Sequence, residues 1–354
     1  MQKFGKTGVL LVNLGTPDAP TRAAVYKYLK QFLTDGRVID YPRPLRDILV
    51  GGIIAPIRSG AFNPVKLTKS TKLYDELWTE NGSPLKYYGE QVAAGVQERL
   101  GEDFQVELAM RYQSPSIESA IKKMVLNKVS EIVVFPMFPQ YASATTGSVH
   151  QEVMRLLSKE ENIPNVRMIN SYYDFGPMID IFVANAQTFD LDSYDHILFS
   201  YHGVPERYLR KADYFGHCTK TENCCRQITA VNQFCYSAQC YGTTRALVEK
   251  LGLREDQYTT CFQSQLGPEQ WTRPATGDIV EEQAKRGAKR LLVFSPAFVA
   301  DCLETIIEIT VEYQEEFEEM GGEHVDLVPS LNDDPRWMDA IAMLVRGEAV
   351  PVVA

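Results

Sequence analysis

Short apolar runs alternate with amphipathic stretches along most of the chain. The apolar runs lie at 9–15, 106–112, 132–136 and 166–169 in the first half, and at 197–201, 259–262, 291–294 and 325–328 in the second. The stretches between them, such as 117–126 and 279–288, place apolar residues at helical spacing. Strands that alternate with helices are typical of parallel sheets, so this pattern predicts an α/β protein.

The two halves of the chain resemble each other. Asn13-Leu14-Gly15-Thr16-Pro17 echoes Tyr201-His202-Gly203-Val204-Pro205, and 134–138 echoes 294–298. We therefore expect two Rossmann-like lobes, each a parallel sheet flanked by helices, with a cleft between them. The echoes are short, so a chance similarity is the alternative. No GxGxxG motif follows any of these runs, which argues against a dinucleotide site.

The pattern also predicts the domain boundaries. The first lobe is expected at 1–170 and contains an interruption at about 36–83. The second lobe is expected at 171–325 and contains a cysteine-rich insertion at about 218–240. Residues 326–354 are expected to pack back on the lobes. Within the first interruption, 41–58 is apolar, broken by Gly and Pro and flanked by Arg, which favours a hydrophobic lip over a kinked core helix.

Composition excludes several classes of function. The chain has 354 residues, 45% of them hydrophobic, and a net charge of −10, as in soluble globular proteins. This charge argues against nucleic-acid binding, which needs basic patches, and is compatible with a cationic substrate. The chain has no apolar run long enough to span a membrane, and its N-terminal apolar stretch is too short for a signal peptide. We expect a cytoplasmic protein.

One histidine and a row of carboxylates are the candidate catalytic groups. His202 ends an apolar run, and in open α/β sheets the carboxyl ends of strands bind ligands. Asp301, Glu304, Glu308, Glu312 and Glu315 recur at steps of three or four residues and predict one acidic helix face. That face is either simply solvated or, because carboxylates repel each other, a path for a hydrated divalent cation.

The chain resembles the ferrochelatase family over nearly its whole length. The resemblance is carried by Asn13 to Pro17, Gly82 to Leu85, Met110 to Tyr112, Pro139 to Tyr141, Thr145 to Ser148, Ser200 to Pro205, Phe262 to Trp271, Asp301 to Glu308, and Ser330 to Asn332. It implies that the protein inserts Fe²⁺ into protoporphyrin IX to give protohaem and two protons, the terminal step of haem biosynthesis. It also implies that the porphyrin lies between two Rossmann-like lobes.

The resemblance implies roles for individual residues. His202 is the catalytic histidine, acting as proton acceptor or as metal ligand. Glu304 faces it across the ring and is assisted toward the metal by Asp301 and Glu308. Cys302 stands where some relatives carry histidine, which leaves the metal preference open.

The porphyrin itself is expected to contact residues from both lobes. Tyr141, Arg111, Ser143 and Trp271 line the cleft, and Arg58, Lys66 or Lys69 pair with the propionates. The apolar lip would contact the macrocycle and the membrane surface through Leu45, Ile48, Leu49, Ile53 and Ile54.

Five of the seven cysteines crowd into the second interruption. Cys218, Cys224, Cys225, Cys235 and Cys240 are spaced Cys-x5-Cys-Cys-x9-Cys-x4-Cys, which matches neither common zinc motifs nor the plant-type ferredoxin motif. The segment resembles the insertion with which some bacterial ferrochelatases hold a [2Fe–2S] cluster. Four of the five would be ligands, in a structural or sensing role. Zinc and free thiols are the alternatives.

Other functions remain to be weighed against ferrochelatase activity. A coproporphyrin III ferrochelatase or a related cobalt chelatase would share these residues. A porphyrin-binding protein or iron–sulfur sensor without turnover is a different class, but a carrier needs no base, so His202 with its carboxylates favours an enzyme. A periplasmic two-lobed binding protein would need a signal peptide.

Overall fold

The structure is a computed structural model that describes the chain except for residues 1–4, 49, 51–63, 219–223, 266–268 and 349–354 and the side chains of 64–69. The chain divides into two compact units. The first comprises Met1–Met137, Ala142–Asn170 and Ile341–Gly347, and the second Phe138–Tyr141, Ser171–Ala340 and Glu348–Ala354. Each unit is described by itself.

The first unit is built on a parallel sheet of four strands in the order β2-β1-β3-β4. The strands are β1 (Thr7–Gly15), β2 (Phe104–Tyr112), β3 (Glu131–Pro136) and β4 (Asn165–Met168). Every residue of β1 from Thr7 to Val12 is buried, because both neighbouring strands and both faces of the sheet are covered. Such continuous apolar runs, rather than alternating ones, are what buried parallel strands require.

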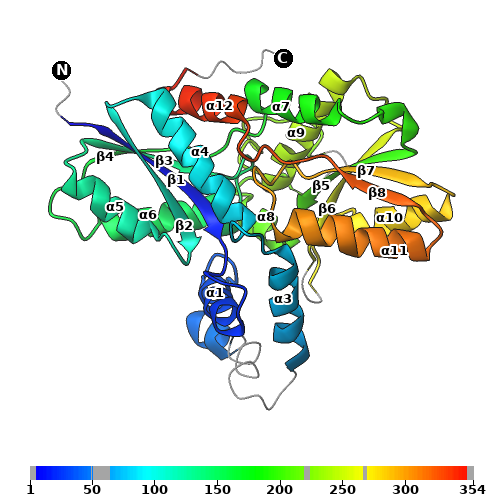
Figure 1. Ribbon diagram of the computed structural model, residues 1–354, viewed down its shortest axis with the longest axis horizontal. Helices are drawn as coiled ribbons and strands as arrows, with labels where there is room; N and C mark the ends of the chain where they lie inside the picture. Colours follow the sequence, from blue (N-terminus) through cyan, green and yellow to red (C-terminus); the bar gives the residue numbers. More distant parts are fainter. Residues whose placement is uncertain (1–4, 49, 51–63, 219–223, 266–268, 349–354) are drawn as a thin grey trace. The chain divides into compact units, whose positions relative to one another are not determined.

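Helices cover both faces of this sheet (Figure 1). The covering helices are α4 (Pro84–Leu100), α5 (Ile117–Leu126) and α6 (Ser148–Leu157), whereas α1 (Arg22–Thr34) and α3 (Pro64–Leu77) pack against each other. Gly89 of α4 packs against Leu108, whereas Met124 of α5 packs against Gly8. Gly8 pairs with Gln105, three residues from Leu108, so Gly8 and Leu108 point to opposite faces. The glycines let α4 and α5 approach the sheet closely.

The second unit repeats the same topology. Its sheet has the order β6-β5-β7-β8, with β5 (His196–His202), β6 (Tyr258–Gln263), β7 (Arg290–Phe294) and β8 (His324–Leu327), all parallel. Its helices are α7 (Gly176–Ala186), η2 (Leu191–Ser193), α8 (Glu206–Ala212), α9 (Tyr236–Leu251), α10 (Thr276–Lys285), η3 (Leu303–Tyr313) and α11 (Gln314–Glu319). Helix α12 (Pro335–Arg346) has residues in both units.

One hydrophobic core cluster of the second unit lies between its sheet and the helices α10, η3 and α11 (Figure 1). Leu198, Val293, Ile309 and Phe317 are fully buried there. The predicted fold class, two α/β lobes each built on a parallel sheet, is confirmed.

The acidic stretch after β7 was predicted wrongly in one respect. The spacing of its carboxylates predicts a regular α-helix from Asp301 to Glu315, but 303–313 forms the π-helix η3, and α-helical geometry begins only at Gln314. The first unit has a shorter π-helix, η1 (Ser143–Gly147), at the corresponding place after β3. The π-helix uses i→i+5 backbone hydrogen bonds in place of the i→i+4 bonds of an α-helix, and the spacing of the carboxylates did not indicate this change.

The predicted lip is described only in part. Residues 43–48 are helical, with Leu45 45% and Ile48 70% exposed, whereas Val50 is buried against Leu33. Leu49, Ile53 and Ile54 lie outside the described residues. In the described part of the chain, no helix is both long and apolar enough to cross a membrane.

The end of β1 gives a test of the fold. Gly15 has φ +114°, and a Cβ there would lie 2.0 Å from the Tyr112 carbonyl oxygen. We expect G15A to lower the free energy of unfolding by about 3 kcal/mol, since backbone strain and displacement of β2 add.

Gly101 provides the matched control. It also has positive φ, +76°, but a Cβ there would meet nothing within 4 Å. G101A should therefore lower the free energy of unfolding by only about 1–2 kcal/mol, the backbone strain alone. Urea unfolding of both variants measures the difference, and equal losses would contradict this account of β1 and β2.

Candidate active site

His202 is held in one tautomer at the end of β5. Its Nδ1 lies 2.6 Å from the carbonyl oxygen of Gly203, which accepts but does not donate, so Nδ1 carries the proton. The lone pair is therefore on Nε2, where an imidazole binds a proton or a metal. The backbone carbonyl of His202 accepts a hydrogen bond from the Tyr236 hydroxyl at 2.7 Å.

Aromatic rings surround this imidazole. The ring centroids of Trp271 and Phe298 each lie 6.4 Å from that of His202. A Cβ on Gly203 would lie 2.8 Å from the Gln263 carbonyl oxygen and 3.2 Å from the Trp271 ring, so glycine is what allows this approach. The Trp271 Nε1 is buried and has no hydrogen-bond partner among the described residues.

The three candidate carboxylates of the second unit differ in how far they are engaged. Glu308 accepts hydrogen bonds from the Ser264 N–H at 2.8 Å, the Gln263 amide at 3.0 Å and the Ser264 hydroxyl. Asp301 accepts from the Asn332 amide at 2.6 Å and the Thr305 hydroxyl at 3.1 Å. These bonds fasten η3 to its neighbours, which is a structural use of both groups.

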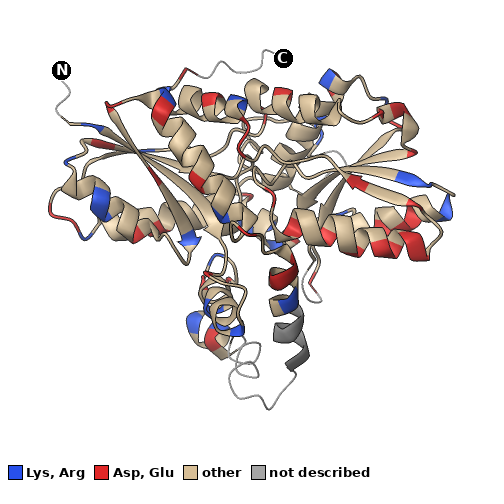
Figure 2. Ribbon diagram, viewed as in Figure 1, with Lys and Arg blue, Asp and Glu red and all other residues tan. Residues whose placement is uncertain are grey.

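The Glu304 carboxylate accepts a single hydrogen bond within the described structure, from the Cys302 thiol at 3.1 Å. Burial raises the pKa of that thiol well above its ordinary value, and the Glu304 charge adds to the shift. Cys302 is therefore a neutral donor. Further acidic residues follow along α11, which is largely red in Figure 2.

In the first unit, Asp35 is the centre of a polar network that the sequence did not indicate. Its carboxylate accepts hydrogen bonds from Arg111 at 2.6 Å, Ser148 at 2.6 Å, Tyr112 at 2.9 Å and the Arg37 N–H at 2.7 Å. Burial by itself would raise the pKa of Asp35, but the bonds from Ser148 and Arg37 and the Arg111 charge outweigh it and lower the pKa. Arg111 is thus already paired.

Ser143 and Tyr141, two further residues predicted to contact the porphyrin, are also hydrogen-bonded to neighbouring residues. Arg37 donates to the Ser143 hydroxyl at 2.9 Å, which joins the start of η1 to the Asp35 network. In the second unit, the Tyr141 N–H donates to Gln239 Oε1 at 2.7 Å.

The cysteines of the insertion contact one another in a chain. The Sγ atoms of Cys224 and Cys225 are 3.7 Å apart, Cys218 contacts Cys224, and Cys225 donates to Cys235. That bond raises the pKa of Cys225 and lowers the pKa of Cys235. Cys240 is fully buried, contacts the Tyr236 hydroxyl and has its pKa raised by burial. In the described parts of the chain, no three His, Cys, Asp or Glu side chains are grouped as one metal ion would need.

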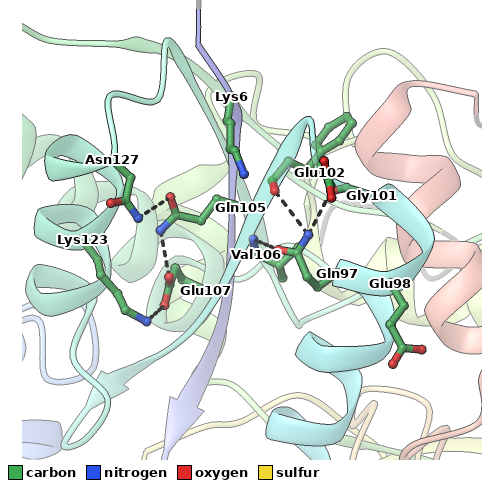
Figure 3. Close-up of a pocket in the computed structure, with 11 residues that line it drawn as sticks. Lys6, Gln97, Glu98, Gly101, Glu102, Gln105, Val106, Glu107, Lys123 and Asn127 are labelled. Carbon is green, nitrogen blue, oxygen red and sulfur yellow. Dashed lines mark hydrogen bonds and ion pairs between the residues drawn. The ribbon is translucent and has the colours of Figure 1, made fainter.

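A polar hollow of about 790 Å³ in the first unit contains none of these groups (Figure 3). Gln97 bridges its wall by bonding the backbone of Gly101, Phe104 and Val106, and Lys123 pairs with Glu107 at 2.8 Å. Gln97, Lys123 and Glu107 are thus hydrogen-bonded or paired within the protein. We interpret the hollow as the polar edge of β2 rather than as a ligand site.

Comparison with known proteins identifies the family. The ferrochelatase family model matches residues 6–349. The chain belongs to the ferrochelatase family. A ferrochelatase of Legionella pneumophila (strain Lens) is 41% identical over 341 residues, covering 96% of this chain and 99% of the relative. A ferrochelatase of Coxiella burnetii (strain Dugway 5J108-111) is also 41% identical, covering 96% and 93%.

A solved structure shares the fold of this ferrochelatase family member. SirB from Bacillus subtilis with Fe³⁺ matches with a TM-score of 0.52 and 12% identity, covering 98% of this chain and 96% of SirB. At that identity the likeness shows the fold alone.

The structure brings some predicted residues of this ferrochelatase together and leaves others untested. His202 lies beside Trp271, and Arg111 and Ser143 join one network. Arg58 lies outside the described residues, as do the side chains of Lys66 and Lys69. Sequence reasoning missed Asp35, Tyr236 and Gln239, because single polar residues at a helix end or within a helix give no periodic signal.

The Asp35 network predicts a pH dependence of stability. Because its folded-state pKa lies below the unfolded value of about 3.9, the carboxylate contributes stability above about pH 4, and this is lost as pH falls through the folded pKa. We expect D35N to lower the free energy of unfolding by about 3 kcal/mol at pH 7, the cost of breaking a buried pair. Below about pH 4, the free energy of unfolding of D35N should fall less steeply with pH than that of the wild type.

Asp18 offers the control for this measurement. It pairs with Lys27 at 3.6 Å on the surface of the same unit. D18N should change the free energy of unfolding by less than about 0.5 kcal/mol. Urea unfolding between pH 2.5 and 7 compares the variants, and a D35N profile parallel to wild type would contradict the assignment.

Proposed function

We propose that this member of the family inserts Fe²⁺ into protoporphyrin IX and releases two protons. The observation that carries the proposal is His202, whose Nδ1–H is bonded to the Gly203 carbonyl and whose Nε2 is therefore a base. Pyrrole N–H groups are weak acids, so metal insertion needs such a base within reach of the ring. A binding protein without turnover would not need one.

His202 and Glu304 are the proposed catalytic pair. His202 Nε2 accepts a pyrrole proton, and the Glu304 carboxylate, the least engaged of the three, balances the charge of the incoming iron. We propose that Asp301 and Glu308 assist at the metal indirectly. Their oxygens already accept hydrogen bonds, and these bonds hold η3, and with it Glu304, in place. Iron is the substrate of the reaction, not a resident ion.

Each proposed porphyrin contact uses a ring face or a hydrogen-bond donor of the side chain. Trp271 and Tyr141 supply ring faces, and the Trp271 N–H is an unused donor. Arg111 and Ser143 act as fixed hydrogen-bond donors, since the Arg111 charge is balanced by Asp35. Arg58 is proposed for a propionate from the sequence alone.

The lip is proposed to touch the membrane surface. Leu45 and Ile48 are exposed on a helix that also carries Arg43 and Arg46. Exposed apolar side chains flanked by cations are typical of contact with an anionic lipid surface. A very apolar substrate is a chemical reason for such contact.

We also propose that Cys218, Cys224, Cys225 and Cys235 hold a [2Fe–2S] cluster. The support is their chain of thiol contacts, which matches a two-iron cluster with two cysteines on each iron better than one metal ion with all its ligands together. Cys240 is left out because it contacts Tyr236 instead. When bound, the cluster would cross-link the segment.

An anaerobic insertion assay tests the enzymatic proposal. Purified protein is mixed with protoporphyrin IX and ferrous iron, and loss of porphyrin fluorescence is followed. We expect turnover by the wild type and a loss of about 10²- to 10⁴-fold in H202A, the usual worth of a general base. Turnover only with coproporphyrin III or only with Co²⁺ would reassign the substrate. No turnover with any of them would leave a binding or sensing protein.

Two carboxylate variants sharpen the same assay. E304Q should lower activity while leaving the melting temperature close to that of wild type, because the Glu304 carboxylate accepts only one hydrogen bond within the described structure. E308Q should lower the melting temperature, because it disturbs the bonds from Ser264 and Gln263. The reverse pattern would exchange the roles of the two residues.

Absorbance and iron content of purified variants test the cluster. C235S should lose the iron–sulfur absorbance, whereas C240S should keep it, since Cys240 is not a proposed ligand. Cys235 directly precedes α9 and is partly exposed, whereas Cys240 lies in α9 and is fully buried, so C240S is the more demanding control for stability. A colourless wild type, prepared anaerobically and containing zinc or free thiols only, would exclude the cluster.

A further inference from the structure

The cysteine segment and His202 are joined through the start of one helix. Helix α9 begins at Tyr236, directly after Cys235. Tyr236 is 7% exposed, and its hydroxyl donates to the His202 carbonyl at 2.7 Å. A proposed cluster ligand is thus one residue away from a group that bonds the backbone of the proposed base.

That hydrogen bond holds the peptide group from which the imidazole projects. The peptide between His202 and Gly203 is bonded on its other side as well, because the Gly203 N–H donates to the Gln263 carbonyl at 2.8 Å. The imidazole Nδ1 is bonded to the next carbonyl, that of Gly203. The direction of Nε2 therefore depends on the plane of this peptide, which Tyr236 and Gln263 fix from opposite ends.

A second residue of α9 links the segment to Tyr141. Gln239 is fully buried, and its amide donates to the Gln233 carbonyl at 2.7 Å while its oxygen accepts from the Tyr141 N–H at 2.7 Å. One face of α9 thus contacts two of the proposed site residues.

Hydrogen bonds hold the cysteine segment together and join it to α9, so a movement of its thiols would also move the start of α9. Asn232 donates to the carbonyls of Cys224 and Gln227, each at 2.8 Å, and its own carbonyl accepts from the Cys235 N–H at 2.8 Å. The Cys225 thiol also lies 3.3 Å from the Ser237 hydroxyl on α9.

We propose that Tyr236 is a positioning residue that couples the cysteine segment to His202. This inference rests on the proposed function, in which His202 is the base. The cysteine segment then supports metal insertion by holding the Tyr236 hydroxyl in position, and no electron transfer is needed. Disturbing the thiols shifts Tyr236, releases the His202 carbonyl and turns Nε2 away from its working direction.

Y236F tests the positioning role, with Y201F as the matched control. Tyr201 is also buried, and its hydroxyl also joins β5 to α9, through Thr244 at 2.9 Å, but does not bond His202. We expect Y236F to lower kcat about tenfold, a change of about 1.4 kcal/mol in the barrier, with KM for protoporphyrin IX within about twofold. Y201F should leave kcat within about twofold at a similar loss in melting temperature.

C235S, alone and combined with Y236F, tests the coupling. If the segment acts through Tyr236, C235S lowers kcat in the wild-type background and changes it little in the Y236F background. Multiplicative effects of the two substitutions would overturn the coupling. Equal kcat for Y236F and Y201F would overturn the positioning role.

The imidazole signals give a readout that does not need activity. The chain has five histidines, and the ¹⁵N-labelled spectrum of H202A assigns the His202 signals. Y236F and C235S should shift the His202 ring nitrogens, whereas Y201F should not. If the wild type lacks chelatase activity but this pattern appears, the proposed function fails and the coupling stands. Unshifted His202 signals in Y236F would overturn the coupling whatever the activity.

Discussion

The peptide group between His202 and Gly203 is the constraint on which the candidate site of the second unit depends. Its carbonyl is bonded by Tyr236, its N–H by the backbone of Gln263, and the imidazole by the next carbonyl. Each of these bonds comes from a different element, so β5, β6 and α9 must all be in place before Nε2 has a defined direction. Gly203 is part of the same constraint, because a side chain there would collide with Gln263 and Trp271.

The carboxylates of the second unit differ in how many hydrogen bonds they accept. Glu308 and Asp301 have their oxygens bonded to Ser264, Gln263, Asn332 and Thr305, and so they fasten the π-helix η3 to the ends of its neighbours. A carboxylate that already accepts several hydrogen bonds has less to give a cation. The Glu304 carboxylate, on the same helix, accepts one hydrogen bond, from the Cys302 thiol, and this contrast is why Glu304 is the proposed reactive group.

The first unit uses a buried ion pair in the same way. Asp35 gathers Arg111, Tyr112, Ser148 and the backbone of Arg37 around one carboxylate. Such a pair adds little net stability but fixes geometry, since breaking it leaves an unpaired buried charge. Arg111 is therefore a directed donor rather than a mobile cation, which its position in the sequence did not reveal.

The sequence by itself determined the two α/β lobes, their parallel sheets, the place of His202 at a strand end and the family. These follow from apolar runs, strand–helix alternation and ordered motifs, all of which are local. Only the tertiary structure decided that η3 is a π-helix, that Glu304 differs from Glu308, and that Tyr236 bonds His202 across 34 positions of the chain. The Glu308 and Tyr236 contacts depend on hydrogen bonds between residues far apart in the sequence, and no periodicity records which distant partner a side chain will meet.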